Sequence, residues 1–169
     1  MKLTRYTDYA LRVLLHLAAR PERLSSIGEI ARTYRISQNH LMKVVHDLRK
    51  ADFVEAVRGR SGGIRLARPP EQINVGDVVR HTEDGFDLVD CGSCVLAPAC
   101  RLTGVLGEAL TAFMRTLDSY TVADLVVDRL EQLRSFSTGV HLRGRAPALP
   151  PVPESLIDRR ADPGPLHKP

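Results

Sequence analysis

The apolar residues in the first part of the chain change from a helical spacing to a strand spacing, and this change restricts the fold more than any other feature. Residues 5–19, 26–34 and 37–50 repeat apolar side chains at helical intervals, whereas residues 53–57 and 63–67 fit two short strands. The second and third helical segments are only a few residues apart, the length of a helix-turn-helix connection. Three helices followed by a hairpin predict a mainly α fold with a small β-wing, the winged helix-turn-helix.

Individual residues support these boundaries. Pro21 ends the first helical segment, because proline cannot continue a helix. Ser26 and Glu29 have the spacing of a capping box at the start of the second segment, and Ser37 is a good N-cap for the third. The glycines and arginines of residues 58–62 suit a tight hairpin between the strands.

The third helix of such a fold enters the major groove of DNA while its apolar face packs on the first two helices. Gln38 and Asn39 can read adenine edges, and Lys43 can meet a phosphate or a guanine. Met42 and His46 also point outward on the helical pattern. Arginines in the hairpin suit phosphate or minor-groove contact. The candidate DNA-binding residues are Ser37, Gln38, Asn39, His40, Lys43, Arg58, Arg60, Ser61, Gly62 and Gly63.

Charge divides the chain in the same way. Residues 1–70 carry 14 Lys and Arg against 6 Asp and Glu, whereas residues 71–169 carry 10 against 14. A basic segment joined to an acidic one is typical of a polyanion-binding domain with an accessory part. We therefore expect double-stranded operator DNA as a partner of the first segment.

The second part of the chain is again helical. A short helix is predicted around residues 73–79, with Asn74 as its cap, and a long apolar stripe begins at Arg101. A second copy of this long helix is the expected partner for the stripe, which predicts a homodimer. Thr121 and Asp124 are expected to cap a further helix, whose apolar residues are Leu125, Val126, Leu130 and Leu133. Residues 138–169 are rich in proline and predict a disordered tail.

The cysteines of the chain, Cys91, Cys94 and Cys100, all lie within one loop before the long helix. An odd number cannot pair completely into disulfides, whereas three thiolates can hold a metal centre and leave one coordination position open. The spacing favours an iron–sulfur cluster. A zinc site completed by a histidine and a thiol redox switch are the alternatives, with His81 and His16 as the nearest other ligands.

These features define the expected organisation. A DNA-binding domain covers residues 1–82, a cysteine loop residues 83–100, dimerisation helices residues 101–137 and the tail residues 138–169. The chain has no run of 18 uninterrupted apolar residues, so we expect no membrane association. Polar residues interrupt the apolar stretch near the N-terminus, so we expect an amphipathic helix there rather than a signal peptide. The expected compartment is the cytoplasm, where thiols stay reduced.

Several segments, in order, resemble the Rrf family of winged-helix regulators, and most closely its nitric-oxide-sensing repressors. The matching segments are residues 3–12, 37–43, 57–66, 73–79, 98–102 and 120–126. The resemblance implies a homodimeric repressor, not an enzyme, with an iron–sulfur cluster held by the three cysteines. It also implies that the fourth ligand is a carboxylate from the first helix of the other subunit, at the position of Asp8. The related cluster-assembly regulators instead have a histidine where this chain has Thr103.

The function that follows is a nitric-oxide-sensitive transcriptional repressor. It would bind a palindromic operator as a homodimer and be released when its cluster is nitrosylated. A four-iron cluster (4Fe–4S) is favoured, and a two-iron cluster (2Fe–2S) is the alternative. The other functions left open are a winged-helix regulator that answers another cluster or redox signal, and one that contains structural zinc.

Overall fold

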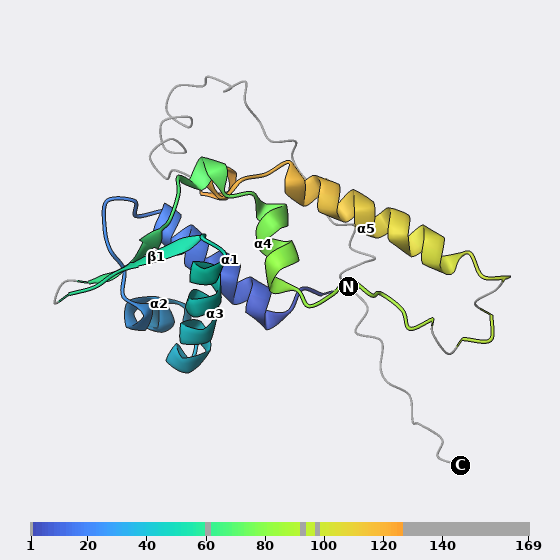
Figure 1. The fold of residues 1–169 in the computed structure, drawn as a ribbon, viewed down its shortest axis with the longest axis horizontal. Helices are drawn as coiled ribbons and strands as arrows, with labels where there is room; N and C mark the ends of the chain where they lie inside the picture. Colours follow the sequence, from blue (N-terminus) through green and yellow to red (C-terminus); the bar gives the residue numbers. More distant parts are fainter. Residues whose placement is uncertain (1, 60–61, 92–93, 97–98, 127–169) are drawn as a thin grey trace, which may run out of the picture. The chain divides into compact units, whose positions relative to one another are not determined.

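Three helices and a two-stranded antiparallel sheet form the N-terminal part of the structure, a computed structural model that describes residues 2–59, 62–91, 94–96 and 99–126 (Figure 1). The elements are α1 (Arg5–Ala18), α2 (Ile27–Tyr34), α3 (Gln38–Lys50), β1 (Val54–Val57) and β2 (Gly63–Leu66). The strands pair from Val54 opposite Leu66 to Val57 opposite Gly63. The predicted winged helix-turn-helix is therefore confirmed.

Short side chains begin the helices largely as the sequence indicates. Thr4 accepts a hydrogen bond from the backbone N–H of Thr7 at the start of α1, and Ser26 accepts one from the backbone N–H of Glu29 at the start of α2. The reciprocal bond of the predicted capping box is not formed, because the Glu29 carboxylate pairs with Arg23 instead. Ser37 occupies the N-cap position of α3 but makes no side-chain capping bond. Its hydroxyl is therefore free of the capping bond that the sequence predicts.

The core lies where α1 packs against α3, β2 and two later helices, α4 (Val75–Thr82) and α6 (Val122–Leu125). The predicted stripe of α1 is buried at Ala10, Leu14 and Leu17, but Val13 and His16 are buried as well. Because α1 is covered from several sides, it buries a wider face than one stripe. The apolar stripe of α3 is buried as predicted, at Leu41, Val44, Val45 and Leu48.

The chain then continues through a short 3-10 helix, η1 (Pro70–Gln72), into α4 (Val75–Thr82), α5 (Leu102–Asp118) and α6 (Val122–Leu125). Asn74 accepts a hydrogen bond from the backbone N–H of Asp77, as expected of a cap, and Thr121 forms a complete capping box with Asp124. Helix α6 ends at Leu125, and Val126, which the sequence predicts to be helical, is extended. The predictions for Leu130, Leu133 and the tail fall outside the described residues.

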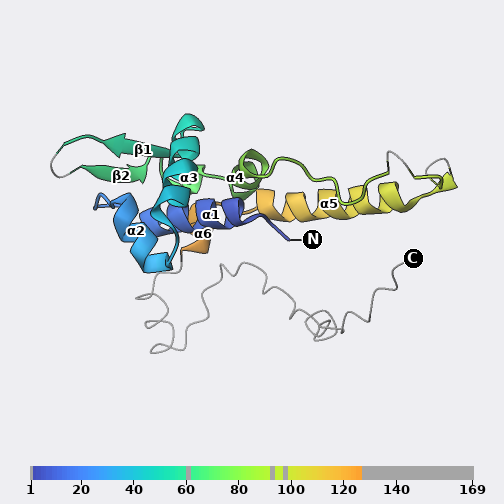
Figure 2. The same cartoon turned by 90° about the horizontal axis from the view of Figure 1, so that it is seen from below.

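Helix α5 differs from the other long helices in its burial. The structure describes all of its residues, and among them only Met114 is buried. Leu102 is 49% exposed and Val105 is 59% exposed. Figure 2 shows α5 beside α4 at its C-terminal end, consistent with the contacts between these two helices. Its predicted apolar stripe is thus present but mostly uncovered.

Within the described ranges, no helix combines the length and apolar character that a membrane crossing requires.

Candidate DNA interface and candidate cluster site

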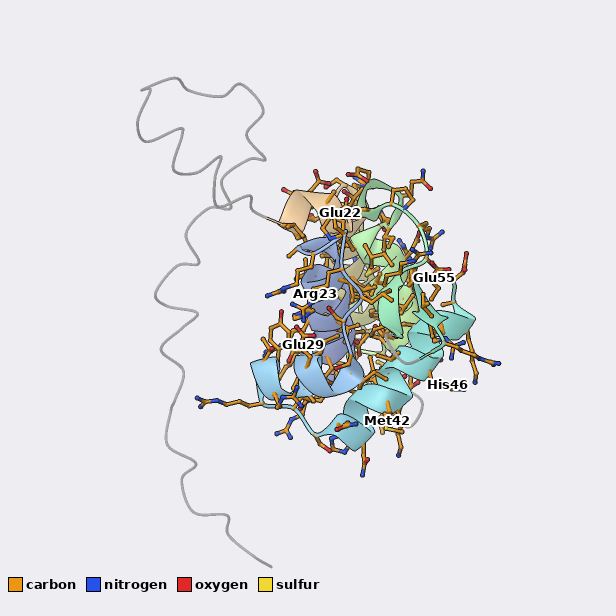
Figure 3. The ribbon with its side chains drawn as sticks, turned by 90° about the vertical axis from the view of Figure 1, so that its left-hand side faces the viewer. Glu22, Arg23, Glu29, Met42, His46 and Glu55 are labelled. Atoms are coloured by element: carbon orange, nitrogen blue, oxygen red, sulfur yellow. The ribbon has the colours of Figure 1, made fainter. Side chains whose placement is uncertain are left out.

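The N-terminal half of α3 presents the predicted DNA-reading residues to solvent. Ser37, Gln38, Asn39, His40 and Lys43 are all exposed. Figure 3 shows that Met42 and His46 also lie on an outward side of α3, a pairing expected from their spacing of four residues. The structure therefore brings the α3 candidates together on one surface.

Helix α3 is held in place by polar contacts as well as by its core residues. The hydroxyl of Tyr6 donates to the backbone carbonyl of Lys43 at 3.5 Å, and His81 Nε2 lies 3.1 Å from Asp47 Oδ2. Burial, followed by the nearby carboxylate of Asp47, raises the pKa of Tyr6 to about 12, so its phenol stays protonated. The ring of His81 also meets Phe53 edge-on at 5.9 Å between centroids. These contacts fix α3 to α1, α4 and the base of the wing.

The wing residues divide into two groups. Arg58 is exposed and free to approach a phosphate, whereas Arg60 and Ser61 lie outside the described residues. Gly62 and Gly63 are needed by the hairpin itself. A Cβ at Gly62 would come within 2.3 Å of the Val57 carbonyl oxygen, and one at Gly63 within 2.9 Å of the Ser25 carbonyl oxygen. Their position indicates a structural contribution, which the sequence pattern alone did not separate from DNA contact.

The cysteine loop leaves its thiols accessible. Cys91, Cys94 and Cys100 are free, the first partly buried and the other two exposed. Cys91 Sγ and Thr103 Oγ1 share a hydrogen bond at 3.4 Å, and the backbone N–H of Leu102 donates to Cys100 Sγ at 3.4 Å. In the described part of the chain, no three His, Cys, Asp or Glu side chains lie close enough to hold a metal ion. The three thiols therefore share a loop without forming a closed site.

Asp8, the predicted fourth ligand, lies on the first turn of α1. Its Oδ1 accepts a hydrogen bond from Arg12 Nε at 2.8 Å, and both side chains are nearly half exposed. An exposed pair of this kind contributes little to stability. The carboxylate is thus accessible, and exchange of its partner costs little.

The two histidines considered as alternative ligands are engaged elsewhere. His16 is 1% exposed and packs edge-on against Tyr34, so it lies in the core and not on a helix surface. Burial, followed by the charge of Arg20, lowers the pKa of His16. His81 pairs with Asp47, as described above. Neither histidine joins the cysteines in a group within the described residues.

A polar junction that the sequence analysis missed links α1 to the residue that begins the cysteine segment. Glu83 Oε1 accepts hydrogen bonds from the backbone N–H of Thr4 at 2.8 Å and from the hydroxyls of Thr4 and Thr7. The buried hydroxyl of Thr82 donates to Thr7 Oγ1 at 3.0 Å. Burial opposes ionisation of Glu83, but the hydrogen bonds from Thr7 and Thr4 together lower its pKa. In the sequence, the sign of this junction that was available is the spacing of Thr4 and Thr7, which lie three residues apart.

A second junction joins α4 to the C-terminal end of α5. Arg80 donates to Asp118 Oδ2 at 2.6 Å, and this hydrogen bond lowers the pKa of Asp118. The amide of Asn74 donates to the backbone carbonyl of Asp118 at 2.7 Å. Gly76 lies so close to Asp118 that a Cβ would come within 1.9 Å of Oδ1. The start of α4 and the end of α5 therefore fit closely.

Comparison with known proteins identifies the family. Residues 3–128 match the Rrf2 family, described as an iron-dependent transcriptional regulator. The chain is 53% identical over 146 residues to the HTH-type transcriptional regulator NsrR of Shouchella clausii, spanning 82% of this chain and 98% of that protein. It is 56% identical over 135 residues to NsrR of Bacillus subtilis, spanning 76% and 92%.

A solved structure agrees with this assignment. CymR, the global cysteine regulator of B. subtilis, superposes with a TM-score of 0.64 and 30% identity over 76% of this chain and 99% of that one. The names of the relatives confirm the prediction of a DNA-binding transcriptional regulator rather than an enzyme. The chain belongs to the Rrf2 family of transcriptional regulators.

Proposed function

We propose that the chain is a homodimeric, nitric-oxide-sensitive repressor of a palindromic operator. An iron–sulfur cluster would be held by Cys91, Cys94 and Cys100 of one subunit and by Asp8 of the partner subunit. A four-iron cluster is favoured, since three thiolates and one carboxylate serve one cluster. The cytoplasm is the proposed compartment, because it keeps thiols reduced.

The observation that carries the proposal is the set of three accessible thiols in a chain from an iron-dependent family. Thiolates are the usual protein ligands of iron–sulfur clusters. Cys91, Cys94 and Cys100 are bound to one another by no disulfide. The donor set therefore suits such a cluster. When bound, the cluster supplies iron that reacts with nitric oxide.

The homodimer is supported by the exposed apolar face of α5. An apolar stripe at the surface is costly unless another surface covers it. Two copies of α5 packed about a two-fold axis would cover both stripes. Residues 101–137, as dimerisation helices, would then place two DNA-binding domains, residues 1–82, for successive major grooves. Residues 83–100 would form the cluster loop between them.

The chain itself offers a route from Asp8 to the recognition helix. Asp8 can exchange between a metal in the partner subunit and Arg12 on its own helix, because the Arg12 pair is exposed and weak. Thr7, directly before Asp8, and Thr4, one turn before it, donate hydrogen bonds to Glu83 at the start of the cysteine segment. The same α1 places Tyr6 against Lys43 of α3. A change at Asp8 would therefore bear on α1, and α1 positions α3.

DNA binding would use the exposed residues of α3 and the wing. Gln38 and Asn39 would read bases, Ser37, His40 and Lys43 would contact bases or phosphates, and Arg58 would follow the backbone. Arg60, Ser61, Gly62 and Gly63 complete the proposed wing surface. A dimer with about six to ten phosphate contacts would lose roughly three to five decades of affinity between about 50 and 200 mM salt.

Anaerobic purification of the full chain tests the cluster, and a gel shift tests sensing. We expect brown protein with iron and sulfide in equal amounts, and release from the operator when a nitric oxide donor is added. A hundredfold loss of affinity corresponds to a coupling of about 2.7 kcal/mol. Colourless protein that contains zinc would contradict the cluster and support structural zinc. Brown protein that stays on DNA after the donor would point to another cluster or redox signal.

The Asp8 ligand has a separate test. Asp8→Ala removes the carboxylate from an exposed position, so the fold should be retained. The visible absorption or circular dichroism spectrum of the cluster should change, because one iron would take a different ligand. Arg12→Ala is the matched control, since it removes the partner of Asp8 but no ligand. An unchanged spectrum for Asp8→Ala would exclude Asp8 as a ligand of the cluster.

A further inference from the structure

Met42 is out of place on the outward face of α3. It is 50% exposed, whereas its neighbour Leu41 is completely buried. The other outward residues around it are polar or basic, including Asn39, Lys43 and His46. An apolar side chain in such a setting gains free energy only when another apolar group covers it.

The surface around Met42 has the composition and charge of a DNA-contacting surface. An open groove runs along α3, and Ile27, Met42 and Val45 are its apolar lining residues. The other lining residues are Asn39, His40, Lys43, His46 and Arg49, and this described lining includes no Asp or Glu. A groove that joins apolar atoms to positive charge complements the major groove, where phosphates border the base edges.

The chemistry of the major groove specifies what Met42 can contact. Base edges there present hydrogen-bond donors and acceptors, except that thymine also presents its C5-methyl group. A thioether side chain has no strong donor or acceptor, but it is flexible and polarizable enough to fit against a methyl group. Asn39 and His46 lie one helical turn before and after Met42. A base pair read by Met42 would thus be flanked by polar contacts.

We propose that Met42 is a specificity-determining residue that selects thymine in each half-site through its 5-methyl group. DNA binding is the family's activity, and the two equivalent half-sites rest on the dimer of the proposed function. Burial of one methyl-sized group is worth about a fourfold change in affinity. Removal of the methyl group from one half-site should weaken binding about fourfold, and removal from both about fifteenfold.

Deoxyuridine provides a direct test, because it differs from thymidine only by the missing methyl group. The full-length protein, purified anaerobically with its iron, first selects duplexes from a randomised pool. Each thymine of the selected sequence is then replaced by deoxyuridine, and affinity is measured by fluorescence anisotropy. We expect one thymine in each half-site to show the fourfold loss with the wild-type protein.

Two variants of Met42 assign the effect to this side chain. Met42→Gln keeps the length of the side chain but replaces its apolar end, so it should bind the thymine and deoxyuridine duplexes equally. Met42→Leu keeps an apolar end and should retain the discrimination. Because Met42 is half exposed, neither variant should disturb the core, and thermal melts confirm folding. Lys43→Ala is the matched control. It should weaken binding to both duplexes alike and keep the preference for thymine over deoxyuridine.

The outcomes separate this inference from the proposed function. Equal affinity of the wild type for the thymine and deoxyuridine duplexes at every position overturns the inference, as does unchanged discrimination in Met42→Gln. A wild type that discriminates but stays bound in the presence of a nitric oxide donor supports the inference and contradicts nitric oxide sensing.

Discussion

Residues 5–82 and residues 83–118 both carry long apolar stretches, yet the first bury them within the chain and the second leave them at the surface. Leu14 and Leu48 are completely buried between helices. In α5, Leu102 and Val105 are about half exposed, and the loop before it leaves Val95 92% exposed. The two regions therefore differ in what completes them.

The two regions differ in whether this chain alone supplies the groups that complete their structure. The helix-turn-helix part has caps, a closed core and polar contacts such as His81 with Asp47, so it is complete without a ligand. Within the described residues, the thiols of the cysteine loop belong to no group that could hold a metal ion, and the apolar face of α5 is mostly exposed. Under the proposed function, a metal centre and a second chain would complete the latter region. A regulator can respond to a signal at such a region while its DNA-binding domain stays folded.

Shortening one apolar side chain in each region should give the largest difference in the free energy of unfolding between the two regions. Leu14→Ala opens a cavity in the core and should lower the free energy of unfolding by about 2–5 kcal/mol. Val105→Ala should change it by less than about 0.5 kcal/mol in dilute protein, because the side chain is exposed, but should weaken self-association. Urea unfolding and sedimentation velocity measure the two effects. If Val105→Ala costs as much as Leu14→Ala without altering association, α5 packs within its own chain.

Removal of one thiol should change iron content and operator binding while the DNA-binding domain stays folded. Cys94→Ser takes away an exposed thiol that we propose as a cluster ligand, so we expect loss of bound iron and about a hundredfold weaker operator binding, or about 2.7 kcal/mol. The far-ultraviolet circular dichroism of the helices should stay the same. Leu96→Ala, in the same loop and also exposed, is the control and should keep its iron. Full iron content in Cys94→Ser would remove this thiol from the site.

The sequence predicts the first region in greater detail than the second, for physical reasons. The stripe of α3 and the caps Ser26, Asn74 and Thr121 are local patterns, and the structure reproduces them. Burial of His16 depends on α1 being covered from several sides, which no local pattern records. The helical spacing of apolar residues also predicts the position of α5 correctly.

Long-range polar contacts were the least predictable part of the candidate sites. The bonds between Glu83 and Thr4, and between Arg80 and Asp118, join residues far apart in sequence. The shared loop of the cysteines is evident from the sequence, whereas an Asp8 ligand comes only from family resemblance. If Asp8 acts across a dimer, one chain by itself cannot bring it to the cysteines.

The junction at Glu83 is the point where the two regions meet, and Glu83→Gln tests whether it couples them. The substitution removes the charged acceptor of bonds from Thr4 and Thr7, so the free energy of unfolding should fall by about 1 kcal/mol at neutral pH. Because the hydrogen bonds hold the folded pKa below the ordinary 4.5, this contribution is present above pH 4.5 and is lost as the pH falls through the folded pKa.

Chemical unfolding at neutral and acidic pH checks the Glu83 effect. Glu22→Gln, at an exposed position between α1 and α2 (Figure 3), is the control and should change stability little. Coupling predicts that Glu83→Gln also reduces the difference in operator affinity between protein with and without iron. An unchanged difference would leave Glu83 as a structural bond alone.

His16 offers a test confined to the DNA-binding domain. Burial lowers its folded pKa below the ordinary 6.5, so the proton binds more tightly to the unfolded chain. Its contribution to stability is therefore complete above pH 6.5 and is lost as the pH falls below it, by at most about 1.4 kcal/mol per pH unit. Urea unfolding between about pH 8 and 5 should show this slope in the wild type. His16→Leu should reduce the slope, whereas His46→Ala, on the exposed face of α3, should leave it unchanged; equal slopes in all three proteins would show that protonation of His16 does not oppose folding.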